Sequence, residues 1–321
     1  MAHGNHLPHG PFMNTQPSTE ITRIAMTLSA IAYAEAEQIP TLLANPTLST
    51  RANWHLHWQA QDIGNQALVA RHGKTGQLAV AIRGSIVDPS LPAFWVDWLH
   101  ENLSLGQLVW PWGNPPEDAL VAQGSLHGLQ ALLDMTDAQG APITQALIEA
   151  GLAESTLPVL VTGHSLGAAP AEVLALRLCQ LHPNNTWLPL TFAAPPVGAP
   201  GLGSWMRLML GDSSGRFFNP LDVVPRAWCD MQWILTSYPP PGPEIPVAAS
   251  EVVAFVERVL KGMDLQYAHG MEGRPLEGSS LASDDSWFSE VGHQHAHDTY
   301  LKLVGAPLVP LEPQAPKTQA S

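Results

Sequence analysis

Charged side chains are scarce in this chain of 321 residues, and positive ones are the scarcest. Asp, Glu, Lys and Arg together make up 13% of the residues, and 14 Lys and Arg stand against 28 Asp and Glu, for a net charge of -14. A chain with this excess of negative charge repels nucleic acids and anionic membrane surfaces. We therefore expect no nucleic-acid partner, and a neutral substrate fits this charge better.

Cysteine and long apolar runs are also lacking. Cys179 and Cys229 are the only cysteines, too few for a disulfide framework, although their spacing leaves one bridge open. No apolar run reaches the ~20 residues of a membrane-spanning helix, so we expect no stable membrane anchor. The N-terminal residues are unlike a secretory signal, because no basic stretch precedes an apolar one. The cytoplasm is the default expectation, and secretion stays open because such a tail can replace a native leader.

The composition of both ends differs from that of folded protein. Residues 1–18 are rich in His, Gly and Pro and are interpreted as a flexible tail, and residues 305–321 as a proline-rich disordered tail. Residues 19–304 between them show no internal repeat and no second core pattern, which favours a single domain. Within it, the turn-rich region 238–287 looks inserted.

Short apolar runs alternate with longer helical patterns, which indicates an α/β fold in which crossover helices join the strands of a largely parallel sheet. A strand pair is expected around the turn His72–Gly76, where glycine permits the backbone angles of a tight turn. The expected strands are 67–71, 77–83, 157–162, 187–193 and 216–219. The expected helices are 21–36, 124–137, 166–181 and 250–262.

The pattern Gly163-His164-Ser165-Leu166-Gly167 lies where the apolar run 157–162 meets a helical stretch. A strand that turns directly into a helix holds the serine at strained backbone angles, and side chains two residues before and after it would collide. Glycine at both places is typical of a nucleophile elbow, so we predict Ser165 as an exposed nucleophile. The Leu166 N–H, at the helix start, can stabilise an oxyanion. A helix-capping serine is the alternative interpretation.

Motifs along the chain, in one order, resemble those of the class 3 lipase family, which contains the fungal triacylglycerol lipases. They are LAVAIRGS, DWLHENL, TGHSLGAA, LTFAAPPVG, FNPLDVVPR and HAHDTYL, and the resemblance runs from Ile21 to Val304. It implies an α/β-hydrolase fold with a largely parallel central sheet flanked by helices and a lid-like insertion, here at 86–99. It also implies hydrolysis of carboxylic (acyl) esters without a metal or organic cofactor.

The resemblance assigns roles to further residues. Ser85, which follows Arg-Gly, is implied to give a second backbone N–H to the oxyanion hole. Asp222 is implied to be the triad acid, and it also follows the expected strand 216–219, where it could accept the N–H of a catalytic imidazole. The order serine, acid, histidine is that of the α/β-hydrolases.

The base must come from a segment with three alternating histidines, His293, His295 and His297. The family pattern of a histidine with a tyrosine three residues later selects His297 with Tyr300. Alternating histidines on an extended segment could instead converge on a metal, but no cluster of Cys, Asp or Glu ligands accompanies them. In the family, the histidine that matches His164 is structural.

Two departures from the family affect the surroundings of the site. Pro170 stands where the family usually has alanine, and we expect it to alter the packing of the helix after the nucleophile. Between Ser85 and Asp97 the chain has a proline-containing insertion, so the lid shape cannot be carried over. Trp95 and Trp98 in this part are candidates for a lid or acyl-binding rim, with burial in the core as the equal alternative.

The prediction from the sequence is thus a lipase or carboxylesterase that acts on acyl esters or neutral lipids through Ser165, Asp222 and His297 and an acyl-enzyme. Two other classes remain. The same triad could serve an acyltransferase, a thioesterase or an amidase, and a hydrolase scaffold could bind a hydrophobic ligand without catalysis. The sequence sets no oligomeric state.

Overall fold

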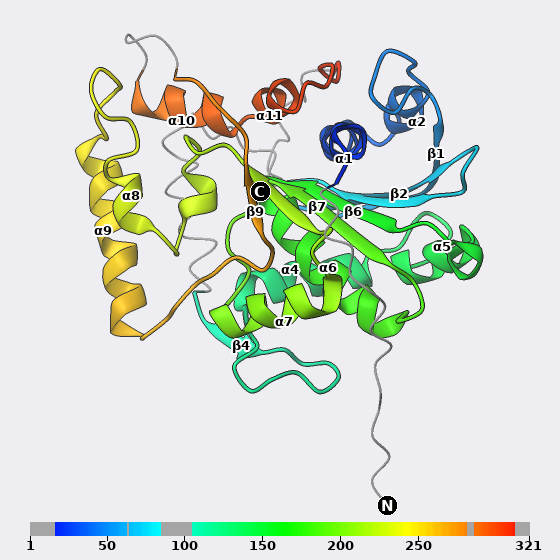
Figure 1. Cartoon of the computed structure of the whole chain (residues 1–321), viewed down its shortest axis with the longest axis horizontal. Coiled ribbons are helices and arrows are strands. Elements are labelled where there is room, and N and C mark those ends of the chain that lie inside the picture. The colour runs from blue at the N-terminus through cyan, green and yellow to red at the C-terminus, as the bar shows by residue number, and fades with distance from the viewer. Residues whose placement is uncertain (1–16, 63, 85–104, 281–285, 312–321) are drawn as a thin grey trace, which may run out of the picture.

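The computed structural model describes residues 17–62, 64–84, 105–280 and 286–311. At its centre lies a seven-stranded sheet with the strand order β1-β2-β3-β6-β7-β8-β9 (Figure 1). β1, β2 and β3 pair antiparallel, and each pair from β3 to β9 is parallel. The strands are β1 (Trp54–Gln61), β2 (Gln66–His72), β3 (Leu78–Ile82), β6 (Val159–His164), β7 (Trp187–Phe192), β8 (Gly215–Phe218) and β9 (Gly273–Pro275). A separate antiparallel pair is formed by β4 (Gln107–Val109) and β5 (Leu120–Ala122).

The central strands are buried on both faces because alternate side chains point to opposite sides of the sheet. In β3, Val80 and Ile82 join one apolar cluster, whereas Ala79 and Ala81 join the other. Every residue of β3 and β6 is buried. The short apolar runs of the sequence therefore correspond to strands covered by a layer of helices on each face.

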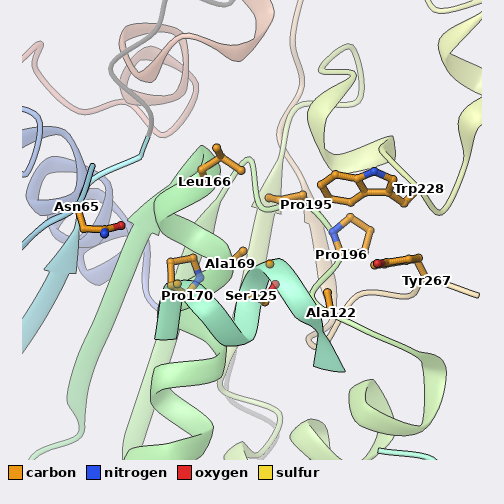
Figure 2. A pocket seen from close by; sticks show the side chains of 12 residues that line it. Asn65, Ala122, Ser125, Leu166, Ala169, Pro170, Pro195, Pro196, Trp228 and Tyr267 are labelled. Atoms are coloured by element: carbon orange, nitrogen blue, oxygen red, sulfur yellow. The ribbon is translucent and has the colours of Figure 1, made fainter. Parts of the chain in front are cut away.

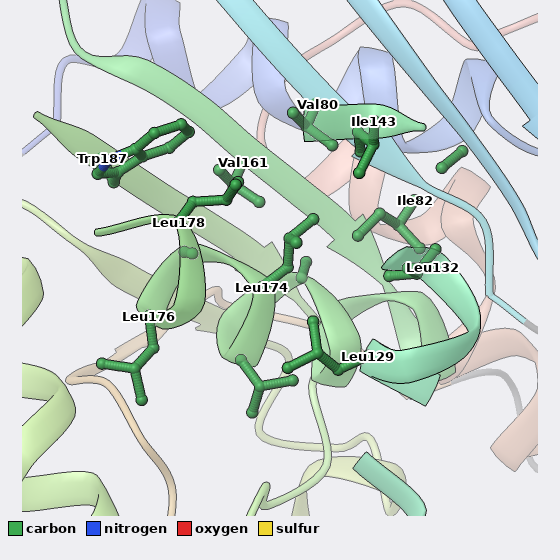
Figure 3. Packing of buried hydrophobic residues seen from close by; sticks show 14 of the residues in the cluster. Val80, Ile82, Leu129, Leu132, Ile143, Val161, Leu174, Leu176, Leu178 and Trp187 are labelled. Atoms are coloured by element: carbon green, nitrogen blue, oxygen red, sulfur yellow. The ribbon is translucent and has the colours of Figure 1, made fainter. Parts of the chain in front are cut away.

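Helices cover both faces of this sheet (Figure 1). α1 and α11 pack on one face, together with α2, and the other face carries α4, α5, α6 and α7. Figure 3 shows the second layer, in which Leu174 and Leu178 of α6 lie against Val161 of β6. These helices are α1 (Thr19–Ile31), α2 (Ile39–Leu43), α4 (Gln123–Asp134), α5 (Ile143–Glu149), α6 (Ala168–Leu181), α7 (Pro200–Leu210) and α11 (His297–Leu303).

A third apolar cluster lies beside the sheet and includes buried residues of the region 238–287, which the sequence suggests is inserted. α9 (Val247–Gly262) buries Val253, Val256 and Leu260 against residues that include Val223 and Val224. α8 (Met231–Ile234) and α10 (Trp287–His295) contribute to the same cluster. Between α9 and α10 the chain forms β9, which pairs parallel with β8 at one edge of the sheet. The expected lid at 86–99 lies outside the described residues.

The predicted fold class, a largely parallel α/β-hydrolase sheet flanked by helices, is confirmed. The expected hairpin is also present, with Gly76 at a φ of 72° in the turn between β2 and β3. Cys179 and Cys229 are both free, so the bridge that the sequence left open is not formed. Within the part of the chain that the structure describes, no helix is both long enough and apolar enough to cross a membrane.

Candidate active site

Ser165 lies at a sharp bend between a strand and a helix. β6 ends at His164, a single 3-10 turn covers Ser165–Gly167, and α6 begins at Ala168. Ser165 has a φ of 60°, in the left-handed region that residues with a side chain rarely adopt. Its buried backbone is therefore held at the strained angles that the elbow pattern predicts.

The two glycines of the elbow are required by close backbone packing. A Cβ atom on Gly163 would lie 2.3 Å from the carbonyl oxygen of Gly167. A Cβ atom on Gly167 would lie 2.5 Å from the carbonyl oxygen of Ile82, on the neighbouring strand β3. The predicted reason for glycine on both sides of the serine, avoidance of a collision, is confirmed by these distances.

His295, and not His297, reaches Ser165, the predicted nucleophile. The Nε2 atom of His295 lies 2.7 Å from Ser165 Oγ, and its Nδ1 atom lies 2.8 Å from Asp222 Oδ2. All three side chains are buried, and Asp222 is fully covered. The structure therefore does not place His297 beside Ser165, as the sequence pattern predicts. Asp222, the predicted acid, contacts His295 instead of His297.

His295 and His297 lie in different helices because a turn at Ala296 separates them. His295 is the last residue of α10, Ala296 has the extended angles φ -58° and ψ 139°, and His297 is the first residue of α11. The His297 ring instead contacts Asp298, with 2.9 Å between Nδ1 and Oδ1, and lies 5.1 Å from the ring of Tyr33. The segment is thus not extended, and the arrangement of alternating histidines considered for a metal site is absent from it.

Asp222 receives three hydrogen bonds, which satisfy its buried carboxylate. His295 Nδ1 and the Tyr300 hydroxyl share Oδ2, each at 2.8 Å, and the Val224 N–H donates to Oδ1 at 3.0 Å. Tyr300 also accepts the N–H of Asn219, which follows β8. Tyr300 therefore contacts the acid as the sequence pattern suggests, although the histidine in this cluster precedes it by five residues. No separate sequence signal distinguishes His295 from His293 and His297.

Ser165 is less open than the sequence suggests, because its exposed fraction is only 4%. A pocket of about 200 Å³ lies beside the next residue, Leu166 (Figure 2). In that view Pro196, Trp228 and Tyr267 gather at one end of the pocket, where the two aromatic rings lie 5.7 Å apart. Ser165 itself is thus almost fully covered, and the pocket opens next to it at Leu166.

Of the other residues that the sequence analysis singles out, the structure describes Leu166 and Pro170. Leu166 borders the pocket at the start of the turn into α6, and Pro170, in the first turn of α6, lines the same pocket. Proline is tolerated in a first helical turn, so the break of the helix that a mid-helix proline would cause is avoided. Ser85, Trp95 and Trp98 lie outside the described residues. Among the residues that are described, no group of three or more His, Cys, Asp or Glu side chains is arranged to hold a metal ion.

Part of the chain matches a known protein family. Residues 106–231 match the family model of the class 3 lipases, Lipase (class 3). No curated protein sequence matches the chain. Over these residues the match supports the resemblance to the class 3 lipases that the sequence motifs indicate.

Solved lipase structures share the fold. The M37 lipase has a TM-score of 0.75 at 22% identity, over 90% of this chain and 92% of that one. A triacylglycerol lipase whose catalytic centre is formed by a serine protease triad has a TM-score of 0.55 at 19% identity, over 82% of both chains. The triacylglyceride lipase of Rhizomucor miehei has a TM-score of 0.53 at 20% identity, over 80% of both.

Proposed function

We propose that this protein is a lipase or esterase that cleaves acyl esters with Ser165 as nucleophile, His295 as base and Asp222 as acid. The observation that carries the proposal is the continuous contact from Ser165 Oγ through the His295 ring to the Asp222 carboxylate, at 2.7 and 2.8 Å. A serine hydroxyl is a weak nucleophile until a base within hydrogen-bond reach takes its proton, and the base must itself be oriented by a third group. This cluster supplies both requirements.

The proposed chemistry assigns one proton path. Because the Asp222 carboxylate accepts the Nδ1–H of His295, the lone pair of the neutral ring is at Nε2 and faces Ser165. Nε2 takes the serine proton as Oγ attacks the ester carbonyl, and the carboxylate stabilises the imidazolium that forms. The imidazolium then protonates the leaving alcohol, which leaves an acyl-enzyme. Water, deprotonated by the same Nε2, releases the carboxylic acid and restores Ser165.

Charge on the attacked carbonyl oxygen requires donors that are already in place. We assign one donor to the Leu166 N–H, at the positive end of α6, where the helix dipole favours negative charge. Ser85 remains the predicted second donor, because it directly follows Gly84 and Gly84 lies against the elbow: a Cβ atom on Gly84 would be 3.2 Å from Ser165 Cβ.

The substrate class is inferred from the pocket beside Leu166. Its lining includes Ala122, Ala169, Pro195, Pro196 and Trp228, which offer carbon surface and no charge. Its volume of about 200 Å³ is below the roughly 300–1,000 Å³ of sites that enclose a whole drug-sized ligand. We propose that it receives one acyl chain of an ester, and the net charge of -14 further favours a neutral lipid over an anionic one.

The test compares the native protein with Ser165→Ala and with Ser204→Ala. The exposed Ser204 hydroxyl on α7 donates to the Pro200 carbonyl and accepts a hydrogen bond from Arg207 of the same helix. With p-nitrophenyl butyrate, we expect Ser165→Ala to lower kcat by about 10⁵–10⁶-fold and Ser204→Ala to leave it unchanged. A fluorophosphonate should add its mass to the tryptic peptide that spans position 165 in the native protein and in Ser204→Ala, but not in Ser165→Ala. Turnover by Ser165→Ala at the native rate would refute the proposal.

A second experiment separates a lipase from an esterase. Because Ser165 is only 4% exposed, we expect the rate to rise sharply when a tributyrin suspension passes its solubility limit. A p-nitrophenyl series from two to sixteen carbons reports the acyl preference, and product analysis with added alcohol distinguishes hydrolysis from acyl transfer. A smooth saturation curve through the solubility limit, with full activity on dissolved esters, would mean that the low exposure of Ser165 does not limit access to it.

A further inference from the structure

His164 is buried beside the proposed nucleophile, yet the proposed reaction gives it no part. Its Nε2 atom lies 2.9 Å from the backbone carbonyl oxygen of His295, and its Nδ1 atom lies 3.0 Å from the Tyr33 hydroxyl. A carbonyl oxygen can only accept a hydrogen bond, so the proton of the His164 ring is on Nε2. Nδ1 of the neutral ring is then the acceptor, and the Tyr33 hydroxyl donates to it.

The protonation states of both side chains fit this direction of donation. Burial, and then the proximity of His295 and His297, lower the pKa of His164 well below its ordinary value, so the ring is neutral. Burial also raises the pKa of Tyr33 above its ordinary value, so the hydroxyl keeps the proton that it donates. A neutral His164 ring, 5.1 Å from the ring of His295, does not repel the imidazolium that the proposed reaction forms there.

The Tyr33 hydroxyl extends these bonds to the end of β3. The backbone N–H of Gly84 donates to the Tyr33 oxygen. The approach is so close that a Cβ atom on Gly84 would lie 2.2 Å from that oxygen and 2.5 Å from the carbonyl oxygen of His164. Any side chain at position 84 would therefore displace Tyr33. The hydrogen bonds run without interruption from Gly84 through Tyr33 and His164 to His295.

The backbone carbonyl of His295 needs such a partner because it ends a helix. The last four carbonyls of an α-helix have no partner within that helix, and α10 ends at His295. The His164 Nε2–H satisfies this carbonyl and so fixes the backbone from which the His295 ring projects. A second constraint, from Asp222, acts on the ring itself. The backbone and the ring of the base are thus held by separate groups.

We propose that Tyr33 and His164 are positioning residues that fix the backbone of His295, and hence its imidazole, relative to Ser165 and to the end of β3. This inference rests on the proposed function, because it assigns a purpose to the geometry of a catalytic histidine. The two residues touch neither the substrate nor the reacting atoms. Their effect is on the alignment of Nε2 with Ser165 Oγ, and a misplacement of about 1 Å can cost on the order of 10²-fold in rate.

The test uses graded variants of the two residues. Tyr33→Phe removes the hydroxyl, and His164→Leu removes the donor to the His295 carbonyl. In His164→Gln the side-chain amide still offers an N–H near the position of Nε2. With p-nitrophenyl butyrate, we expect kcat to fall about 10- to 100-fold in Tyr33→Phe and His164→Leu while KM changes less than about twofold, and we expect His164→Gln to recover most of the lost kcat.

Ser29→Ala is the matched control. Ser29 lies one turn before Tyr33, near the end of α1, and its hydroxyl makes a buried 2.7 Å hydrogen bond to Thr162 of β6. This variant removes a buried contact between the same two elements without touching the proposed series. We expect a lower melting temperature and an unchanged kcat. All rates are divided by the concentration of active sites titrated to completion with a phosphonate, so that loss of folded protein is not counted as loss of rate.

Two outcomes would overturn the inference: an unchanged kcat per site in Tyr33→Phe and His164→Leu, or equal losses in His164→Gln and His164→Leu. Ser165→Ala in the same assay separates this failure from that of the proposed function. If Ser165→Ala is inactive and Tyr33→Phe is fully active, only the positioning role is wrong. If Ser165→Ala retains native turnover, the proposed function itself is wrong.

Discussion

Ser165 and its two partners, His295 and Asp222, are held in place by different kinds of structure. Ser165 is fixed by the main chain, through its φ of 60° and the contacts that leave no room for a side chain on Gly163 or Gly167. His295 and Asp222 are fixed by hydrogen bonds between side chains from different elements. A backbone bend tolerates no added atom, whereas a hydrogen-bond network weakens stepwise as single donors are removed. The two regions should therefore respond differently to substitution.

The largest contrast is expected within the hydrogen-bonded part, between two histidines two residues apart. His295→Ala removes the proposed base and should lower kcat by about 10⁵–10⁶-fold. His297→Ala removes a ring that contacts Asp298 and Tyr33 and should leave kcat within about twofold of native, because that ring does not reach Ser165. Steady-state kinetics on p-nitrophenyl butyrate measures both. Loss of activity in His297→Ala with retention in His295→Ala would reverse the assignment.

The next effect tests the backbone part. Gly163→Ala forces a Cβ atom against the carbonyl oxygen of Gly167, 2.3 Å away, and should lower the free energy of unfolding in urea by about 4 kcal/mol or more. Gly262→Ala is the control, since a Cβ atom on Gly262, the last residue of α9, meets nothing within 4 Å. Alanine there should be neutral or stabilising by up to about 1 kcal/mol. Equal stability of the two variants would show that the elbow can relax, and the main chain would then not fix Ser165 more rigidly than hydrogen bonds fix His295 and Asp222.

The smallest effect concerns the hydrogen bonds that position the Asp222 carboxylate. Tyr300→Phe removes one of the three donors to the buried Asp222 carboxylate, and it also removes the acceptor for the Asn219 N–H. We expect kcat to fall about tenfold and the free energy of unfolding to fall by about 1–3 kcal/mol. Tyr238→Phe, which removes a hydroxyl that donates to the Leu221 carbonyl, should lose stability without loss of kcat. A kcat for Tyr300→Phe as high as that for Tyr238→Phe would mean that two donors position Asp222 sufficiently.

This difference also explains which parts of the site could be predicted from the sequence. The elbow follows from local rules, because the strand, the helix and both glycines lie within a few residues of Ser165, and their geometry is confirmed. The sequence does not single out His295, because its place beside Ser165 depends on where α10 ends and on contacts of that end with residues far away in the sequence, such as His164. The spacing to Tyr300 points to His297, whereas His295 lies beside Ser165, because the spacing assumes one uninterrupted element and a turn at Ala296 divides the segment.

The strands of the sheet also differ in how well local sequence predicts them. The buried strands β3, β6 and β7 follow from short apolar runs, and each lies close to its expected position. β1 was not expected, although alternation in Trp54–Gln61 was an available signal, because a register shift between Leu56 and Trp58 interrupts the pattern. β9 consists of three residues, Gly-Arg-Pro, which have no strand propensity, and it forms only because β8 offers hydrogen-bonding groups beside it.

That short strand has a consequence for shortening the protein. β8 is paired on one side with β7 and on the other with β9, so removal of the region 238–287 would strip one side of β8 of its partner. Bare strand edges recruit strands from other molecules. We therefore expect a trimmed variant to aggregate by edge-to-edge pairing, even if Ser165, His295 and Asp222 keep their arrangement, unless a replacement segment covers that row of peptide groups.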